Sequence, residues 1–560
     1  MANLLDYATH ILPADSLFDV WTTRSPKTLH AVLRSRTPGT SFTPSPVLRP
    51  LVDVVCSGCE AQAFERGVPG AEAARFRARY ASLILPCCGW TRTGGLAHQA
   101  AVSLGLRASA PSSASKVDAI ARQQEKYPIY NGRPPVNCGF DVRLFHPAFE
   151  NFTKRCYGKE KLANEENAAV HNFLVCSAGY YANEKARQGE VTPILATLLG
   201  GRGLTDNINL DGTSADGTIT YSSARTLTPI PLLYFELKNE IGAGDADATH
   251  QVGLLYRKFW SLKKVPHLFP FVGICSMACQ DGNRASCCPT FLLTLMGSWL
   301  CVLGAVFTDR PIVQPLTPLL WLGHVHARKP QYRKVTRLFA ALSTGILELE
   351  EFYSHLDFKL VSEARFFPHI TSFNAGPGHK VQFSYEKYAD PIPNSNKAVF
   401  IANTQDDQNR KIVIKFTEAY NEKAHSLLAA NGLAPPLLSC DRSTFSDFIM
   451  VVMGYVDGKQ LFHKYPQETP SIVLRKVSGA LKVLHENDLV FGDLRSPNIL
   501  VTAQHDVQLV DFDWCGTVGK GEYPADINLI DIEWPKGVVP GGPLQFIHDE
   551  EMLRRLEVRG

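Results

Sequence analysis

The longest stretch of the chain without a charged residue runs from Ala285 to Thr308 and is mostly apolar. By length alone this segment could span a membrane. Gly297-Ser298, however, divides it into two halves of strand length. Buried sheet strands read as continuous apolar runs, because both of their faces are covered. The pattern therefore predicts two buried strands joined near Gly297, and no association with a membrane.

Helical and strand-like periodicities alternate through two further regions of the chain. In the first region the expected helices are 163–181, 190–199, 248–260 and 332–352, and the expected strands are 218–221, 232–237 and 268–275. In the second region the expected strands are 411–416, 448–453, 498–501 and 507–510, with one helix at 472–486. This alternation predicts α/β and α+β domains, each with a core of its own.

The N-terminal part of the chain carries the weakest pattern, although residues 71–85 could form a helix. A run of Ala, Ser and Pro at 110–115 reads as a linker. We therefore expect a multidomain fold of four parts. They are an uncharacterised N-terminal region with linker at 1–115, domains at 116–355 and 365–545, and a tail at 546–560.

Composition favours an ordinary globular protein of 560 residues, long enough for two to four domains. Apolar residues make up 45% and charged residues 20%, and the net charge of +3 points to no particular class of partner. The 14 cysteines are scattered, and the spacing of Cys56-x-x-Cys59 and Cys87-Cys88 does not match a zinc site. Because the N-terminus also lacks the pattern of a secretory signal, we expect an intracellular protein of the cytoplasm or nucleus with reduced cysteines.

Three residues near the C-terminus form a set that suits phosphoryl transfer. Asp493 precedes Asn498 with four residues between them, and Asp511 follows thirteen residues later. Transfer from ATP needs one carboxylate near the attacking hydroxyl, and an Asn and a second carboxylate to hold Mg²⁺ against the phosphates. The two predicted strands that flank this segment would bring the three side chains together.

This segment resembles the catalytic loop of the protein-kinase fold, and its Gly-Asp-Leu form is similar to the aminoglycoside-phosphotransferase branch of that superfamily. The resemblance implies a compact two-lobed domain that binds ATP and Mg²⁺. It also implies further roles. Lys415 would contact the ATP phosphates, and Glu422, or else Glu418, would orient it. Arg495 would stabilise charge on the transferred group, and the backbones of Met453 and Tyr455 would meet the adenine.

The sequence departs from the kinase pattern in ways that bear on regulation. No G-x-G-x-x-G loop precedes Lys415, and Asp513 stands where the D-F-G pattern has glycine. Too few residues follow Asp511 for a full C-terminal lobe. An activation loop of the usual length is therefore not expected.

A second set of residues lies in the middle region. Glu236 and Lys238 share one face of a predicted strand, because side chains alternate with period 2, and Asp216 precedes the neighbouring strand. Asp216 and Glu236 could share a divalent cation, while Lys238 could help to deprotonate a metal-bound water. This combination of groups can hydrolyse a phosphodiester.

The Asp216…Glu236-x-Lys238 set resembles the PD-(D/E)xK restriction-endonuclease-like superfamily, with Ala215 in place of the proline. The resemblance implies an α-β-β-β-α-β core and nucleic acid as a partner. Gln251, at the start of the next helix, matches a Gln frequent in that family. The acidic residue of the family's first helix would be Glu190 or Glu184, and the sequence leaves both open.

Both sets together are similar to kinase-like proteins of mushroom-forming fungi, some of which carry a restriction-endonuclease-like domain and are discussed with Crinkler-type effectors and conflict toxins. The resemblance rests on the segments 490–498, 523–524, 533–538 and 236–242. It implies an ATP- and Mg²⁺-dependent phosphotransferase fused to a nuclease-like domain. The phosphate acceptor, a protein or a small molecule, stays open. The alternatives are a metal-dependent nuclease with a regulatory kinase-like domain, and a pseudokinase scaffold.

Overall fold

The computed structural model describes residues 18–25, 28–35, 93–158, 168–205, 212–223, 226–261, 285–326, 328–358, 360–389 and 397–557. The chain forms two compact units, Met1–Thr93 and Gly94–Gly560. In the first unit, β1 (Phe18–Ser25) and β2 (Thr28–Ser35) form an antiparallel hairpin. The predicted helix at 71–85 and the cysteines at 56, 59, 87 and 88 lie outside the described residues.

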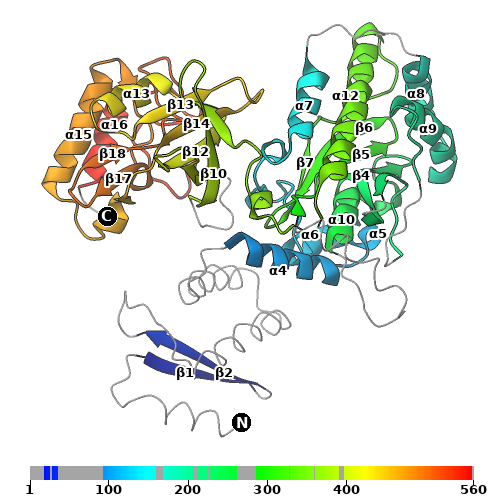
Figure 1. The fold of residues 1–560 in the computed structure, drawn as a ribbon, viewed down its shortest axis with the longest axis horizontal. Coiled ribbons are helices and arrows are strands. Elements are labelled where there is room, and N and C mark those ends of the chain that lie inside the picture. Colours follow the sequence, from blue (N-terminus) through cyan, green and yellow to red (C-terminus); the bar gives the residue numbers. More distant parts are fainter. Residues whose placement is uncertain are drawn as a thin grey trace. The chain divides into compact units, whose positions relative to one another are not determined.

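The second unit begins with helices and a six-stranded mixed sheet in the order β3-β4-β5-β6-β7, with β8 paired to β6 (Figure 1). Only β4 and β5 are parallel among these pairs. The strands are β3 (Gly217–Ser223), β4 (Thr226–Lys238), β5 (Thr290–Met296), β6 (Trp299–Phe307), β7 (Pro311–Pro315) and β8 (Leu320–Trp321).

The uncharged segment of the sequence forms the central hairpin of this sheet. Its two halves are β5 and β6, and they turn at Gly297-Ser298, where Gly297 has a φ of 56°. Every residue of β5 is buried, as a strand covered on both faces must be. The prediction of two buried strands is thus confirmed. None of the helices in the described ranges is long and apolar enough to cross a membrane.

Helices pack against this sheet and around its ends. The long helix α12 lies along α7 (Figure 1) and against β4, and α10 packs on β4 and β5. The helices are α4 (Thr93–Arg107), α5 (Pro111–Ala114), α6 (Val117–Lys126), α7 (Pro147–Tyr157), α8 (Ala168–Ala178), α9 (Glu184–Leu198), α10 (Ala248–Ser261) and α12 (Arg328–His355). Compared with the sequence expectation, α9 and α12 start earlier and α8 ends earlier. The strand expected at 268–275 lies outside the described residues.

The C-terminal part carries a second six-stranded sheet, antiparallel throughout, in the order β13-β14-β12-β11-β10-β9. Strands β12 and β14 confirm the expected strands at 411–416 and 448–453. The bounds are β9 (Ser372–Asn374), β10 (Lys380–Tyr388), β11 (Ala398–Thr404), β12 (Lys411–Thr417), β13 (Leu437–Asp441) and β14 (Ile449–Gly454).

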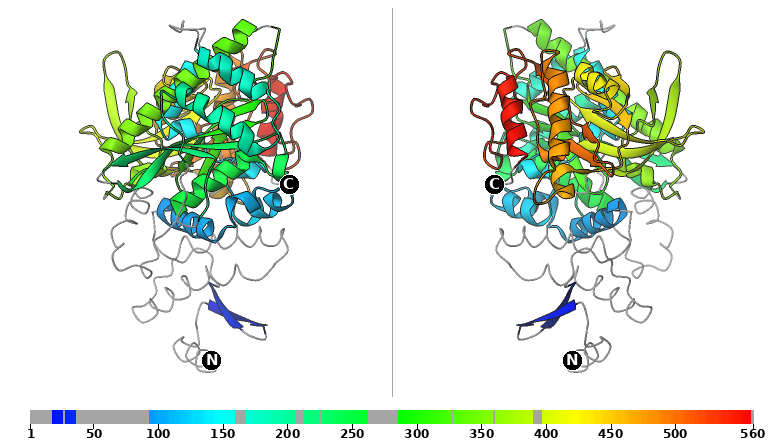
Figure 2. Two further views of the ribbon diagram at one scale, coloured as in Figure 1. Left: turned by 90° about the vertical axis from the view of Figure 1, so that its right-hand side faces the viewer. Right: turned by 90° about the vertical axis from the view of Figure 1, so that its left-hand side faces the viewer.

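Helices and short strands follow this sheet. They are α13 (Glu422–Ala430), α14 (Leu461–Lys464), α15 (Ser471–His485) and α16 (Phe546–Arg555), with β15 (Gly458–Gln460), β16 (Leu489–Val490), β17 (Ile499–Thr502), β18 (Val507–Leu509) and β19 (Gly516–Thr517). The expected helix at 472–486 is α15. The segment expected as a tail contains α16, which packs beside α15 and places Met552 and Leu556 in the same apolar core (Figure 2). It is therefore part of the folded unit.

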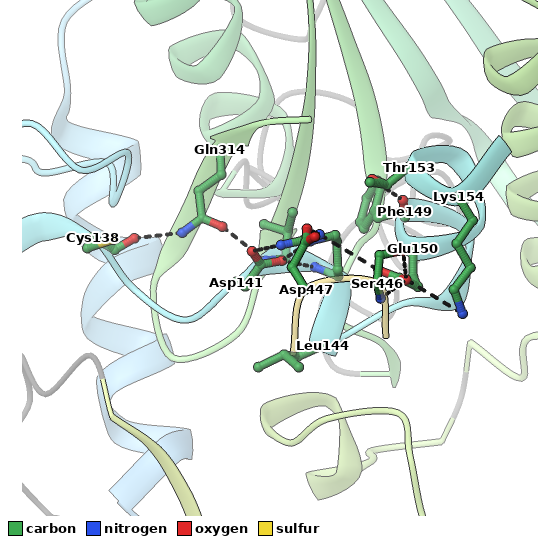
Figure 3. A network of polar contacts seen from close by, with 12 residues as sticks. Cys138, Asp141, Leu144, Phe149, Glu150, Thr153, Lys154, Gln314, Ser446 and Asp447 are labelled. Carbon is green, nitrogen blue, oxygen red and sulfur yellow. Dashed lines mark hydrogen bonds and ion pairs between the residues drawn. The ribbon is translucent and has the colours of Figure 1, made fainter. Parts of the chain in front are cut away.

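A buried carboxylate joins the two sheet regions of this unit. Glu150, on α7, accepts hydrogen bonds from the backbone N–H and the hydroxyl of Ser446, at 2.8 and 2.9 Å (Figure 3). Arg143 pairs with Asp447 at 2.5 Å, and Lys154 lies 3.6 Å from Glu150. Ser446 and Asp447 belong to the turn between β13 and β14. One apolar core also continues from the first sheet into the second, so the second sheet is anchored through this turn.

Candidate active site

The loop after β16 places Asp493 in a buried position between two polar side chains. The Arg495 guanidinium donates from both Nε and Nη2 to the Asp493 carboxylate, the latter at 2.7 Å. Asn498 Nδ2 lies 2.7 Å from Asp493 Oδ2. Gly492 has a φ of 81°, and a Cβ there would lie 3.1 Å from Leu544, so this turn requires glycine. Asp493 and Asn498, which the sequence places with four residues between them, are thus in contact, as predicted.

Asp549 of α16 holds the backbone of this loop in place. Its two carboxylate oxygens accept the backbone N–H groups of Phe491 and Gly492, at 2.8 and 2.9 Å. His485 Nε2, at the end of α15, lies 3.0 Å from the same carboxylate. The sequence analysis missed Asp549, which is only 1% exposed. The available signal was an acidic residue on the side of a helix that also carries Met552.

We expect Asp549→Asn to lower the free energy of unfolding by about 1–3 kcal/mol. An amide offers one oxygen and one NH₂ group to two backbone donors, so one donor would stay unsatisfied. Urea titration followed by tryptophan fluorescence measures this loss. The matched control, Glu550→Gln on the exposed face of the same helix, should shift the free energy by less than about 0.5 kcal/mol. Equal stabilities of the two variants would show that Asp549 does not support the loop.

Asp511 lies beside this loop and between two lysines. Val510 N donates to Asn498 O at 3.0 Å, which brings the start of the Asp-Phe-Asp segment next to the loop. Asp511 Oδ1 lies 2.5 Å from Lys415 Nζ, and Oδ2 lies 3.0 Å from Lys397 Nζ. Burial would raise the pKa of Asp511, but the two lysines outweigh it and hold this pKa below its usual range. The left-handed residue of the segment is Asp511, with a φ of 72°, so the segment does not place a positive φ at Asp513, the position where the D-F-G pattern has glycine.

Lys415 differs from the prediction in its partners. Its side chain is buried on β12 and contacts Asp511 and Asp513, the latter at 2.6 Å. Among the described residues, the ion pairs of Lys415 include neither Glu422 nor Glu418. Glu422 lies on the exposed first turn of α13, near Cys440. A short loop between β12 and α13 leaves the glutamate outside the site.

The two residues expected to meet adenine are placed at the end of β14 and just beyond it. Met453 is buried and pairs with Val413 across the sheet. The backbone N–H of Tyr455 donates to the carbonyl of Lys411 at 3.2 Å. This N–H group is therefore already paired, and the contact of these two backbones with adenine stays a prediction.

The donor set of Asn498 and Asp511 fits Mg²⁺ that arrives with a nucleotide. Among the described residues, no three His, Cys, Asp or Glu side chains are gathered as a complete metal cage. Mg²⁺ in kinase sites is held by one or two protein groups together with waters and substrate phosphates. One carboxylate oxygen of Asp511 faces the half-exposed Lys397, which is where a cation could replace an ammonium group.

The second predicted set also comes together, at the end of β4. Lys238 Nζ lies 3.0 Å from Glu236 Oε1 and 3.5 Å from Glu184 Oε1. Asp216 Oδ2 accepts the backbone N–H of Leu237 at 2.7 Å. Of the two acids left open by the sequence, Glu184 is therefore the one beside Lys238, because α9 begins there and not at 190.

In this cluster, the pKa of Glu236 is shifted by its burial and by its charged neighbours. Burial and the nearby Asp216 raise its pKa to about 8, against the lowering effect of Lys238. Its Oε2 atom is buried without a hydrogen-bond partner. A buried oxygen of this kind suits a cation or a proton donor. Gln251 is directed elsewhere, since its Oε1 accepts a hydrogen bond from Ser115 at 3.4 Å.

Comparisons with known proteins find short local likenesses to protein kinases. The chain is 33% identical over 72 residues to Protein kinase 3 of Dictyostelium discoideum, covering 12% of this chain and 8% of that protein. It is 34% identical over 88 residues to Protein kinase C-like 1B of Caenorhabditis elegans, covering 14% and 12%. For cAMP-dependent protein kinase type 3 of Saccharomyces cerevisiae the figures are 27% over 105 residues, 17% and 25%. The chain thus spans a quarter or less of these relatives, and no family model matches it.

Proposed function

We propose that the chain is an ATP- and Mg²⁺-dependent phosphotransferase of the protein-kinase type. The observation that carries this proposal is the convergence of Asp493, Asn498, Asp511 and Lys415, which come from three separate segments: the loop after β16, the Asp-Phe-Asp segment and β12. The local likeness to three protein kinases supports the same class of activity. The six-stranded antiparallel sheet and the helical part after it would be the two lobes around the nucleotide.

Each residue of the set has a role that its contacts permit. Asp493 would orient the acceptor hydroxyl and accept its proton, a contribution of about 10²–10⁴ in rate for general bases. Arg495 is bound to Asp493 through two hydrogen bonds, so it would fix the carboxylate and not reach the transferred group. Lys415 would bind the nucleotide phosphates, and Asn498 and Asp511 would hold Mg²⁺, which neutralises charge on them.

A second activity is favoured by the cluster around Glu236. Two carboxylates, Asp216 and Glu236, lie near one lysine, and one oxygen of Glu236 lacks a partner. We propose that this cluster is a metal-dependent phosphodiesterase centre of the PD-(D/E)xK type. Asp216 and Glu236 would bind the cation, and Lys238 would activate water. The kinship with fungal kinase-like proteins and Crinkler-type effectors, and a place in the cytoplasm or nucleus, belong to the same proposal.

A thermal-shift experiment tests the first activity. A ligand that binds only the folded chain at 100 times its Kd adds about 2.7 kcal/mol of stability. We expect ATP with Mg²⁺ to raise the Tm, and ATP with excess EDTA to raise it less, because Asp511 binds the phosphates through the metal. AMP is the matched control, since it lacks the β and γ phosphates that Lys415 would contact. An unchanged Tm at millimolar ATP and Mg²⁺ would contradict nucleotide binding.

A further inference from the structure

The Lys415 ammonium lies between two carboxylates of one short segment. Asp511 Oδ1 is 2.5 Å away and Asp513 Oδ1 is 2.6 Å away. The Lys415 side chain is only 8% exposed. A buried charge is costly unless it is paired, so Lys415 needs an anionic partner in every state of the site.

The two carboxylates differ in their remaining contacts. The second oxygen of Asp513 accepts a hydrogen bond from the Thr417 hydroxyl at 2.9 Å. Thr417 lies on β12, the strand that carries Lys415. The second oxygen of Asp511 contacts Lys397, whose side chain is 58% exposed. Asp513 is therefore fixed to the strand of the lysine, whereas Asp511 is held on one side by a group that can leave.

Helix α13 presents a ring, not a carboxylate, to this segment. Its described residues that face the core are Ala424, His425 and Leu428. The His425 imidazole stacks on Phe512, with centroids 4.7 Å apart and planes inclined by 10°. Its two nitrogens contact the Tyr420 hydroxyl and a backbone carbonyl. Burial lowers the pKa of His425 to about 4, so this ring is neutral near pH 7.

Asn421, which precedes α13, is also hydrogen-bonded to the backbone of the Asp-Phe-Asp segment and of the residues just after it. Asn421 N donates to Phe512 O at 3.1 Å, and Asn421 Nδ2 donates to Cys515 O at 3.0 Å. Glu422 and Asp513 both line an open cleft of about 670 Å³. Glu422 is thus on the exposed rim of the helix, while the helix itself is already joined to the Asp-Phe-Asp segment.

We propose that Asp513, and no acidic residue of α13, is the positioning carboxylate that directs Lys415 toward the nucleotide phosphates. This inference rests on the phosphotransferase function proposed above. When a cation engages Asp511, Lys415 keeps Asp513, and the pair is complete without any movement of α13. Asp513 therefore takes the positioning role that a glutamate on the helix would otherwise have.

A matched pair of substitutions in the full chain tests this assignment. Asp513→Asn and Glu422→Gln both replace a carboxylate with an amide at one wall of the same cleft. We expect Asp513→Asn to weaken ATP binding in calorimetry by tenfold or more, with a larger effect on KM for ATP than on kcat. Glu422→Gln should stay within twofold. Thr417→Val, which frees Asp513 without removing its charge, should shift KM in the same direction by a smaller factor.

A second readout does not depend on nucleotide. Amine-directed acetylation of Lys415, followed by mass spectrometry of the nucleotide-free chain, should speed up several-fold in Asp513→Asn and stay unchanged in Glu422→Gln. Faster labelling only in Glu422→Gln would overturn the proposal. So would an Asp513→Asn variant that needs more Mg²⁺ but binds metal-free ATP normally, because Asp513 would then act on the metal. If the wild-type chain fails to bind ATP, the proposed function fails, and labelling still decides whether Asp513 holds Lys415.

Discussion

Asp493→Asn should reduce kcat for phosphotransfer by about 10²–10⁴ while the Kd for ATP with Mg²⁺ stays within a factor of two. The amide keeps the shape of the carboxylate but cannot accept the proton of an acceptor hydroxyl. Asp493 contacts Arg495 and Asn498, whereas Lys415 is paired with Asp511 and Asp513, so the phosphate contacts survive the change. ADP formation in a coupled assay and calorimetric titration with ATP measure the two quantities separately.

The control for this variant is Asp506→Asn. Asp506 is an exposed carboxylate in the turn between β17 and β18, and it pairs with Lys476 at 2.6 Å. Exposed ion pairs contribute about 0–1 kcal/mol, so turnover and stability should both stay near wild type. Wild-type turnover by Asp493→Asn would remove Asp493 from the mechanism. A loss of ATP binding in the same variant would show that Asp493 supports the nucleotide site as a whole.

The parts of the fold that the sequence predicted well are those whose signal is local. The central hairpin was readable because β5 and β6 are uncharged and mostly apolar and turn at one glycine. The start of α9 was not, because Gly189 weakens the helical pattern of its first half. The structure shows that Asn183 caps the helix by accepting a hydrogen bond from the N–H of Ala186 at 2.9 Å. That cap moves the helix start to Glu184 and decides which acid reaches Lys238.

In the candidate site, too, the sequence predicted the local relations and missed those that depend on how distant elements pack. Asp493 and Asn498 lie on one loop, so their spacing fixed their relation. The partner of Lys415 could not be found by counting residues, because the direction in which a helical side chain points depends on how the helix is rotated about its axis. Glu422 consequently points outward and His425 inward. The role of Asp549 could not be predicted from the sequence for another reason. Its partners include backbone N–H groups of a distant loop, and such groups leave no trace in the sequence.

Lys238→Ala should abolish metal-dependent cleavage of nucleic acid, with a loss of at least 100-fold, and leave phosphotransfer unchanged. The ammonium of Lys238 lies between Glu236 and Glu184. Of Asp216, Glu236, Glu184 and Lys238, it is the one group that would take part in activating water without binding the cation. Its removal should therefore stop hydrolysis. We expect excess EDTA to produce the same loss in the wild-type chain, and added Mg²⁺ or Mn²⁺ to restore it. Cleavage of single-stranded and double-stranded DNA and RNA, followed on gels, gives the measurement.

The control for this last variant is Lys185→Ala, an exposed lysine that follows Glu184 on α9. Removing Lys238 also leaves the Glu236 carboxylate buried without the ammonium group that pairs with it, which lowers the stability of the fold. Protonation of Glu236 would relieve this loss of stability. Thermal unfolding of both variants must therefore accompany the cleavage assay. A folded Lys238→Ala chain that cleaves as fast as Lys185→Ala would reject the phosphodiesterase centre. Loss of cleavage in Lys238→Ala with intact ATP turnover, beside the opposite result in Asp493→Asn, would establish two independent centres in one chain.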